Sequence, residues 1–516
     1  MKRLTYFLGT LLVMSIVAVS CSKDSYEPNV TPTPTPSGGG TVTPTPSTTI
    51  SEEIQTGTQF AYDALDVYYL WNKEISSAMN SQLDPSTCED PIATVKKIRY
   101  KDGGGFEASR DEDRWTEIFD DVTPFIESVQ GVNTTNGMSV SVGQFTGSSP
   151  QSYFFIVNYT YKDSPADKAG IKRGDIIISY NGKDITESNL EDAYYGSTKG
   201  TYGMGSWEED GIHDLNKNIE LDAVKMYCDP VIVSKTFDVN GKKVGYLMYD
   251  SFDVESADKL IQVAKQFKSE GVKELILDLR YNGGGYVFTE ELLASMFAPS
   301  SAVQAKELYM QEIYNEVLTK EFSKSDKDFN KTFLSYDHEY GNKGEDGYKK
   351  VSTKDANIGL DKIYAIVTGN SASASESLLV GLSPFVNITT IGEQTYGKYC
   401  TGYILTTDNV YNNPPSIISK WGAYVMVTTY ADRDNKNMAR PVGILPNIEE
   451  SDSPWDGFGL GNENETMLKA ALTAAGKSYA NTRSLQTRPR VNIKPMHDKN
   501  KFARRIMQTP KMEKMK

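Results

Sequence analysis

"ELILDLRYNGGGY", residues 274–286, places a run of three glycines directly after an apolar segment. The apolar half predicts a buried strand. The preceding stretch "ADKLIQVAKQFKSEG" (257–271) has the apolar spacing of an amphipathic helix that stops at a glycine, and "VFTEELLASMF" (287–297) is again helical. This alternation of strand and helix predicts an α/β core.

The alternation extends on both sides of this stretch. Further strands are expected in "KVGYLMYDSF" (243–252), "KIYAIVTGN" (362–370), "ITTIGEQTYGKYC" (388–400) and "GAYVMVTTY" (422–430). The helix expected in "NETMLKAALTAAG" (464–476) closes the core, and the polar residues 323–357 are expected to be an insertion. We therefore assign the core to residues 232–476.

Residues 132–226 have the character of short strands. Within them, "DSPADKAGIKRGDIIISYNGKDIT" (163–186) predicts a short helix, a turn, a β-branched strand and a hairpin turn. This run resembles a PDZ domain of the bacterial protease type. Such domains add a peptide strand to a sheet edge and hold its terminal carboxylate with backbone amides. The resemblance implies that this loop lies near Gly137, Met138, Ser139 and Val140.

The N-terminal residues predict export. Residues 1–21 have two basic residues, an apolar stretch and small residues before Cys21, which is typical of a secretory signal and resembles the lipobox of bacterial lipoproteins. An uncleaved signal anchor is the alternative. Both predict that the body of the chain is exported and held at the membrane. In the main prediction, lipidation of Cys21 anchors it at the bacterial cell envelope, to the outer membrane, facing the periplasm or the surface.

Three other segments complete the domain organisation. Residues 22–50 are rich in Thr, Pro and Gly and predict an extended linker. Residues 51–131 have helical apolar spacing and predict a small helical domain. Residues 477–516 are basic and aperiodic and predict a flexible tail.

Composition limits the classes of function. A chain of 516 residues with 39% hydrophobic residues can bury more than one core. Its formal net charge of -14 opposes attraction to phosphate backbones, so we expect no nucleic-acid partner. Its four cysteines, Cys21, Cys88, Cys228 and Cys400, are spread too widely for a metal site, and one disulfide stays possible.

The stretch "GNSASASES" (369–377) joins an expected strand to an expected helix. Ser373 and Glu376 have the spacing of a capping box, which alone explains them. A serine at a helix N-terminus also lies where backbone amides can stabilise an oxyanion. A nucleophilic serine needs a base. Histidines occur in this chain only in polar stretches or the tail, which leaves a buried lysine, and Lys398 is the candidate.

Three motifs together resemble the C-terminal processing peptidase family, the Ser-Lys serine proteases of peptidase family S41. They are "LDLRYNGGG" (277–285), "SASASES" (371–377) and "GEQTYGKY" (392–399). The resemblance implies a helical region, a PDZ domain and an α/β catalytic core in that order, and polypeptide substrates with free C-termini. It implies Ser373 as nucleophile and Lys398 as general base. The implied oxyanion donors are the amides of Ala374 and of Gly285 or Gly284, without metal or cofactor.

The sequence departs from this family at two positions. Many members have a Gln four residues after the lysine, where this chain has Gly402, and others have an Asp eleven residues after the serine, where it has Pro384. The residues considered as substitutes that orient the lysine are Glu393, Gln394, Thr395 and Tyr403. The main prediction is an exported serine endopeptidase, and the alternative is a catalytically inactive, PDZ-containing peptide-binding lipoprotein.

Overall fold

The computed structural model describes residues 50–101, 113–208, 211–439, 442–479, 493–494 and 504–509. The expected signal sequence with Cys21, and the expected linker up to residue 49, lie outside the described residues. None of the described helices combines the length and the apolar character that a membrane span needs.

The C-terminal core is built around a parallel sheet, which confirms the α/β prediction. Its strands lie in the order β10-β11-β12-β18-β19-β22, and each neighbouring pair from β11 onward is parallel. The bounds are β10 Val231–Val239, β11 Lys242–Tyr249, β12 Glu274–Asp278, β18 Lys362–Val367, β19 Asn387–Gly392 and β22 Ile448–Glu449.

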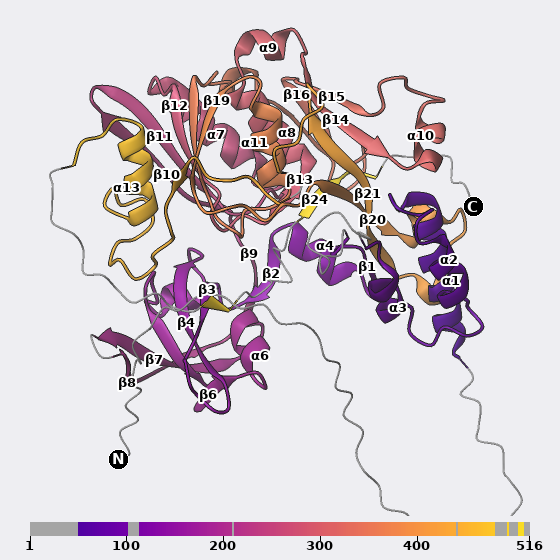
Figure 1. The fold of residues 1–516 in the computed structure, drawn as a ribbon, viewed down its shortest axis with the longest axis horizontal. Helices are drawn as coiled ribbons and strands as arrows, with labels where there is room; N and C mark the ends of the chain where they lie inside the picture. The colour runs from indigo at the N-terminus through magenta and orange to yellow at the C-terminus, as the bar shows by residue number, and fades with distance from the viewer. Residues whose placement is uncertain are drawn as a thin grey trace, which may run out of the picture.

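Helices cover both faces of this sheet. Successive side chains of a strand point to opposite faces, so neighbouring residues of one strand pack against different helices. Leu275 and Leu277 of β12 belong to a hydrophobic cluster with α7, α8 and α11, whereas Ile276 belongs to another cluster with α13. Figure 1 shows α13 apart from the other three helices. Their bounds are α7 Ala257–Ser269, α8 Val287–Phe297, α11 Ala374–Leu382 and α13 Thr466–Ala474.

A second sheet lies beside the first in the order β13-β24-β20-β21-β14-β15, with β1 paired to β21. Its strands come from segments far apart in the chain. Their bounds are β1 Glu117–Phe119, β13 Gly284–Tyr286, β14 Leu308–Tyr314, β15 Lys331–Phe333, β20 Cys400–Thr406, β21 Gly422–Asp432 and β24 Arg504–Met507.

The N-terminal helical region packs directly on this second sheet (Figure 1). Its helices are α1 Glu52–Tyr68, α2 Ser76–Gln82, α3 Pro91–Ile98 and α4 Thr123–Val129. Phe60 and Leu65 of α1 belong to the same hydrophobic cluster as the strands of the core, and Ile118 of β1 pairs with Ala423 of β21. The helical region therefore shares its hydrophobic core with the C-terminal core.

The PDZ region forms a separate sheet in the order β23-β3-β4-β6-β5-β7-β8, with its own hydrophobic cluster. The bounds are β3 Met138–Gln144, β4 Ser152–Thr160, α5 Pro165–Lys168, β5 Ile176–Tyr180, β6 Lys183–Thr186, α6 Leu190–Tyr195, β7 Gly200–Glu208, β8 Gly211–Leu221 and β23 Ile493–Lys494. Strands β2 Val132–Thr135 and β9 Val224–Tyr227 pair with each other where the chain enters and leaves this region.

The remaining elements are short. They are α9 Ser300–Gln304, α10 Glu316–Phe322, β16 Asp337–Tyr340, β17 Lys349–Ser352, η1 Lys354–Ala356, α12 Thr407–Val410 and η2 Ser416–Ile418. Strands β15, β16 and β17 lie within residues 323–357, where the sequence predicts a polar insertion.

The C-terminal segment differs from the flexible tail that the sequence predicts for residues 477–516. Residues 493–494 form β23 at the edge of the PDZ sheet, and residues 504–507 form β24 inside the second sheet. Neither strand has an apolar periodicity of its own. Both form strands because they pair with strands more than a hundred residues earlier in the chain. A local sequence pattern does not predict such long-range pairing.

Candidate active site

Three neighbouring parallel strands end at the same edge of the first sheet, and each is followed by one of the sequence motifs. β12 precedes the glycine turn 283–285, β18 precedes Ser373 and β19 precedes Lys398. The amide of Ala372 donates a hydrogen bond to the Asn282 carbonyl over 3.1 Å, which joins the first two motifs. Ligand sites of open α/β sheets commonly lie at this edge.

Ser373 is the N-cap residue of α11 and has an unusual backbone conformation, with φ of 63°. Such positive φ values are uncommon for a non-glycine residue and are often found at functional sites. The side chain is fully buried, and its Oγ has no hydrogen-bond partner among the described residues. An unengaged hydroxyl at a helix N-terminus is suited to attack a substrate.

The Glu376 carboxylate joins the serine and lysine segments. Its Oε2 accepts hydrogen bonds from the backbone amides of Ser373 (2.8 Å) and Lys398 (2.9 Å). Because one oxygen atom binds both amides, the two backbones are held side by side. Its Oε1 accepts from the Thr395 hydroxyl (2.5 Å) and the Gly397 amide (2.7 Å). The spacing of Ser373 and Glu376 predicts only the helix cap, and this second role has no local sequence pattern.

Burial raises the pKa of Glu376 to about 7, although the hydrogen bonds that it accepts oppose the shift. All four donors favour the ionised carboxylate, because a protonated oxygen would face another hydrogen. The geometry of the Ser373 and Lys398 segments therefore depends on the ionised form of Glu376.

Lys398 is fully buried, and burial lowers the pKa of its amine to about 8. Its Nζ donates a hydrogen bond to Tyr424 Oη over 3.0 Å and lies 4.9 Å from the centre of the Trp115 ring. The Tyr424 hydroxyl in turn donates to the Arg505 carbonyl over 3.1 Å. A lysine that loses its proton near neutral pH can act as a general base.

The Lys398 amine binds Tyr424 on β21, which was not among the four substitutes considered from sequence. Thr395, one of the four, binds Glu376 instead. A Cβ at Gly402 would overlap the Tyr424 ring, so the glycine at the family's Gln position makes room for this tyrosine. The glycine in place of Gln at position 402 was therefore a sequence signal for this tyrosine, but only the pairing of β20 with β21 connects Gly402 to Tyr424.

Two of the histidines lie within the described residues, and they support the choice of a lysine. His338, from the polar stretch 323–357, is buried, and its Nε2 lies 3.0 Å from Ser295 Oγ rather than at Ser373. Burial lowers the pKa of His338 to about 4. His213 lies on β8 of the PDZ region, and His497 lies outside the described residues.

The glycine turn lies against the backbone on either side of Ser373. Ala374 is the first residue of α11, and a Cβ added to Gly284 would lie 2.9 Å from its amide nitrogen. The Gly284 amide already donates to Asn282 Oδ1 over 2.8 Å, so Gly285 is the better candidate for the second donor. Gly285 has a φ of 147°, and a Cβ there would overlap the Phe252 carbonyl. The turn therefore requires glycine.

The predicted peptide-binding residues lie at the start of β3. The amides of Gly137 and Met138 donate to the neighbouring side chains of Thr135 and Asn136, both over 3.0 Å. Ser139 and Val140 continue β3, which pairs with β4 on one side and with β23 on the other. The structure therefore shows a strand added to the edge of β3, whereas the Gly137 and Met138 amides are already engaged.

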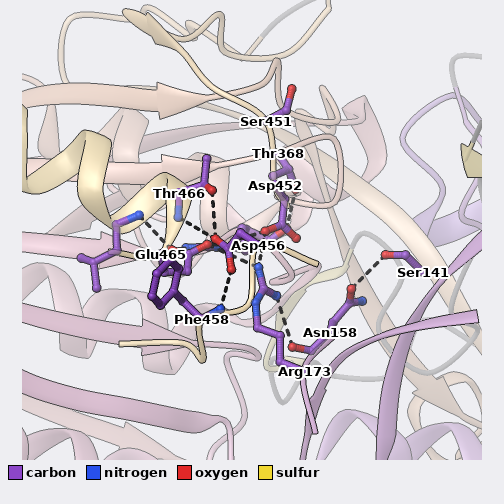
Figure 2. Close-up of polar contacts among 12 residues, drawn as sticks. Ser141, Asn158, Arg173, Thr368, Ser451, Asp452, Asp456, Phe458, Glu465 and Thr466 are labelled. Atoms are coloured by element: carbon purple, nitrogen blue, oxygen red, sulfur yellow. Dashed lines mark hydrogen bonds and ion pairs between the residues drawn. The ribbon is translucent and has the colours of Figure 1, made fainter. Parts of the chain in front are cut away.

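The PDZ region contacts the core through a buried cluster of charges (Figure 2). Arg173, in the turn before β5, donates to Asp452 over 2.6 Å and lies 3.3 Å from Glu465. Arg280, between β12 and the glycine turn, binds the same two carboxylates. The two regions are therefore linked close to the glycine turn.

Three of the four cysteines lie within the described residues. Cys88, Cys228 and Cys400 are all buried, and none forms a disulfide within the part of the chain that is described. The disulfide that the sequence left possible is therefore not formed among these three. Cys21 lies outside the described residues.

Two parts of the chain match known protein families. Residues 243–450 match peptidase family S41, and residues 156–195 match a PDZ domain. Ser373, Lys398 and the glycine turn lie in the first range, and Arg173 lies in the second.

Curated relatives are carboxy-terminal processing proteases. The chain is 28% identical over 239 residues to the carboxy-terminal processing protease CtpA of Bacillus subtilis, covering 46% of this chain and 43% of that protein. It is 23% identical over 343 residues to the carboxyl-terminal-processing protease of Picosynechococcus, covering 66% of this chain and 71% of that protein. The chain thus spans less than half the length of the first relative.

A solved structure supports the fold. A candidate S41 protease from Bacteroides fragilis superposes with a TM-score of 0.56 at 19% identity, covering 81% of this chain and 96% of that one. At this level of identity the likeness concerns the fold alone. The fold is therefore shared, over most of this chain, with a solved protein.

Proposed function

We propose that this chain, whose residues 243–450 belong to peptidase family S41, is a serine endopeptidase of the C-terminal processing type. The observation that carries the proposal is the Glu376 carboxylate, which holds the amides of Ser373 and Lys398 on one oxygen atom. A buried amine with a lowered pKa and an unengaged buried hydroxyl, carried on two segments that Glu376 joins, are both groups that acyl transfer needs.

The reaction follows from these groups. The neutral Lys398 amine removes the proton of Ser373 Oγ as this oxygen attacks the carbonyl carbon of the scissile peptide bond. The amides of Ala374 and Gly285 stabilise the oxyanion that forms. The lysine then returns the proton to the leaving amine, and the C–N bond breaks to give an acyl-enzyme. A water molecule, deprotonated by the same amine, releases the product and regenerates the serine.

The proposed substrates are exported polypeptides with free C-termini. A PDZ domain binds an extended segment by adding it to a sheet edge, and the pairing of β23 with the edge of β3 supports this mode of binding. The proposal includes the location: a lipid anchor on Cys21, followed by the linker of residues 22–50, would hold the enzyme at the bacterial cell envelope.

The test compares the wild type with Ser373→Ala and Lys398→Ala on an unstructured protein. Both variants should lose turnover, and labelling by a fluorophosphonate should disappear in Ser373→Ala. Lys420→Ala is a matched control, because this lysine is exposed. Equal degradation by all four proteins would reject the assignment and leave a tethered peptide-binding protein. Metabolic labelling with a fatty acid, compared in wild type and Cys21→Ala, tests the anchor.

A further inference from the structure

The chain's own C-terminal strand runs through the candidate active site. β24 lies between β13 and β20 and is parallel to both, pairing Arg504 with Gly284, Arg505 with Gly285 and Ile506 with Gly402. The Arg504 amide donates to the Gly283 carbonyl over 2.8 Å. Figure 1 shows this short strand beside β13. A segment from the far end of the chain thus separates the glycine turn from the strand that follows Lys398.

The backbone of β24 lies against the groups proposed for catalysis. A Cβ at Gly284 would overlap the Arg504 carbonyl and lie 2.9 Å from the Ala374 amide nitrogen, so that carbonyl is close to the oxyanion donors. The Arg505 carbonyl accepts from Tyr424, which binds the Lys398 amine. A polypeptide substrate must present its backbone to these same groups. β24 therefore occupies the place of a substrate strand.

The Arg505 side chain fills a closed acidic pocket. Its Nε lies 2.8 Å from Glu290 Oε2 and 3.1 Å from Ser377 Oγ. Its Nη1 lies 3.2 Å from Glu312 Oε1 and 2.5 Å from Thr401 Oγ1. We call the pocket formed by Glu290, Glu312, Ser377 and Thr401 the acidic subsite. Its members come from α8, β14, α11 and β20, which are all elements of the core.

The acidic subsite is suited to a guanidinium group. Glu290 and Glu312 are both buried, and a buried carboxylate without a counter-charge is costly. Burial raises the pKa of Glu312, while the charge of Arg505 opposes the shift. Burial and the charges of Glu290 and Glu312 raise the pKa of the adjacent Glu291 to about 8. A planar guanidinium offers donors to both carboxylates and both hydroxyls at once, which the point charge of a lysine does not.

We propose that the acidic subsite binds an arginine side chain of a polypeptide strand lying between β13 and β20, and that Arg505 fills it in cis. The inference assigns a residue preference to the site of the proposed function. A substrate held by its C-terminus at the PDZ domain reaches the serine with residues that precede the held end. In the tail this order is reversed, because the residues at the PDZ edge (β23) come before those at the serine. The tail is therefore an occupant of the subsite that competes with substrates and is not itself placed as one.

The test measures binding in the full-length chain with Ser373→Ala, so that no turnover is needed. The probe is a fluorescein-labelled peptide with the sequence of residues 501–511, followed by fluorescence anisotropy. Arg505→Glu places a negative charge against two carboxylates and should expel β24. This variant should bind the probe at least about tenfold more tightly than the protein with the unmodified tail does, because a hydrogen-bonded charge pair contributes about 1.5–3 kcal/mol. Gln508→Glu, on an exposed side chain of the same segment, is the matched control and should behave as the parent.

Two further comparisons make the result decisive. Arg505→Lys keeps a positive charge in the pocket and serves as the second variant in case Arg505→Glu does not fold. It should bind the probe with intermediate affinity. A probe with alanine in place of its second arginine should bind Arg505→Glu about tenfold or more weakly. Equal binding of both probes would overturn the proposal. So would loss of folding in Arg505→Glu together with no probe binding by Arg505→Lys, since β24 would then be a structural strand.

Binding and catalysis are separated in this design. With Ser373 restored, Arg505→Glu should raise kcat/KM on an unstructured protein and favour cleavage near arginine. If the chain proves not to be a peptidase, the probe binding still decides whether the subsite recognises arginine. If catalysis is confirmed but the probe does not bind, the proposed function stands and this inference fails.

Discussion

The reaction rate of Ser373 should rise with pH through about 8, because only the neutral form of Lys398 can accept a proton. Burial lowers the pKa of this amine from 10.5 to about 8. At pH 7 about one amine in ten is then neutral, compared with about one in three thousand for an ordinary lysine. Burial therefore increases the amount of active base about 300-fold at neutral pH.

The lysine alone should produce about a tenfold rise in kcat/KM between pH 6 and pH 7, and the curve should level off above about pH 9. Glu376 adds to the slope in the same direction. Its pKa is raised to about 7, and protonation below that value removes an acceptor of the Ser373 and Lys398 amides. The rise should therefore be steeper below pH 7 than above it.

The assay measures kcat/KM on an unstructured protein from pH 5.5 to pH 10, together with the rate of fluorophosphonate labelling of Ser373. Circular dichroism at each pH shows that the fold is unchanged. A midpoint at about 6.5 would indicate a histidine base, and one near about 10.5 an ordinary exposed lysine. Either result, or a rate independent of pH, would refute the argument from burial.

Further predictions concern the residues around the site. Tyr424→Phe removes the acceptor of the Lys398 amine and should lower kcat/KM about 10- to 160-fold, the effect of one hydrogen bond to a charged group; its pH midpoint should fall below that of the wild type, and an unchanged profile would count against the contact. Gly402→Ala should act in the same direction, since its Cβ would overlap the Tyr424 ring. Glu376→Gln should slow fluorophosphonate labelling and remove the extra slope below pH 7, because the amide cannot accept from all four donors; retention of the steep slope would assign it to another group. Burial alone would raise the pKa of Asp452, but Arg173 and Arg280 outweigh it and lower the pKa to about 2. This carboxylate therefore stabilises the fold above about pH 4, and the contribution is lost as the pH falls toward 2. Asp452→Asn should lower the free energy of unfolding at pH 7 by about 2–3 kcal/mol in urea titrations, with the difference disappearing at about pH 2; the exposed Asp361→Asn is the control.

The reacting residues could be proposed from the sequence because the signals are local. The run of apolar residues before the glycines predicts a buried strand, and the spacing of Ser373 and Glu376 predicts the start of a helix. Lys398 follows from the resemblance of its motif to the family. Each of these patterns lies within a few consecutive residues, so no knowledge of the tertiary structure is needed to read it.

The sequence by itself determined the α/β core and the PDZ region, because short-range spacing sets which elements form, and it proposed Ser373 and Lys398 through the resemblance of their motifs to a family. Only the tertiary structure decided that Glu376 joins the serine and lysine segments, that Tyr424 contacts the amine, and that β24 enters the site. These contacts depend on which strand ends lie side by side. That choice is made by packing and by backbone pairing between distant segments, for which no local pattern exists.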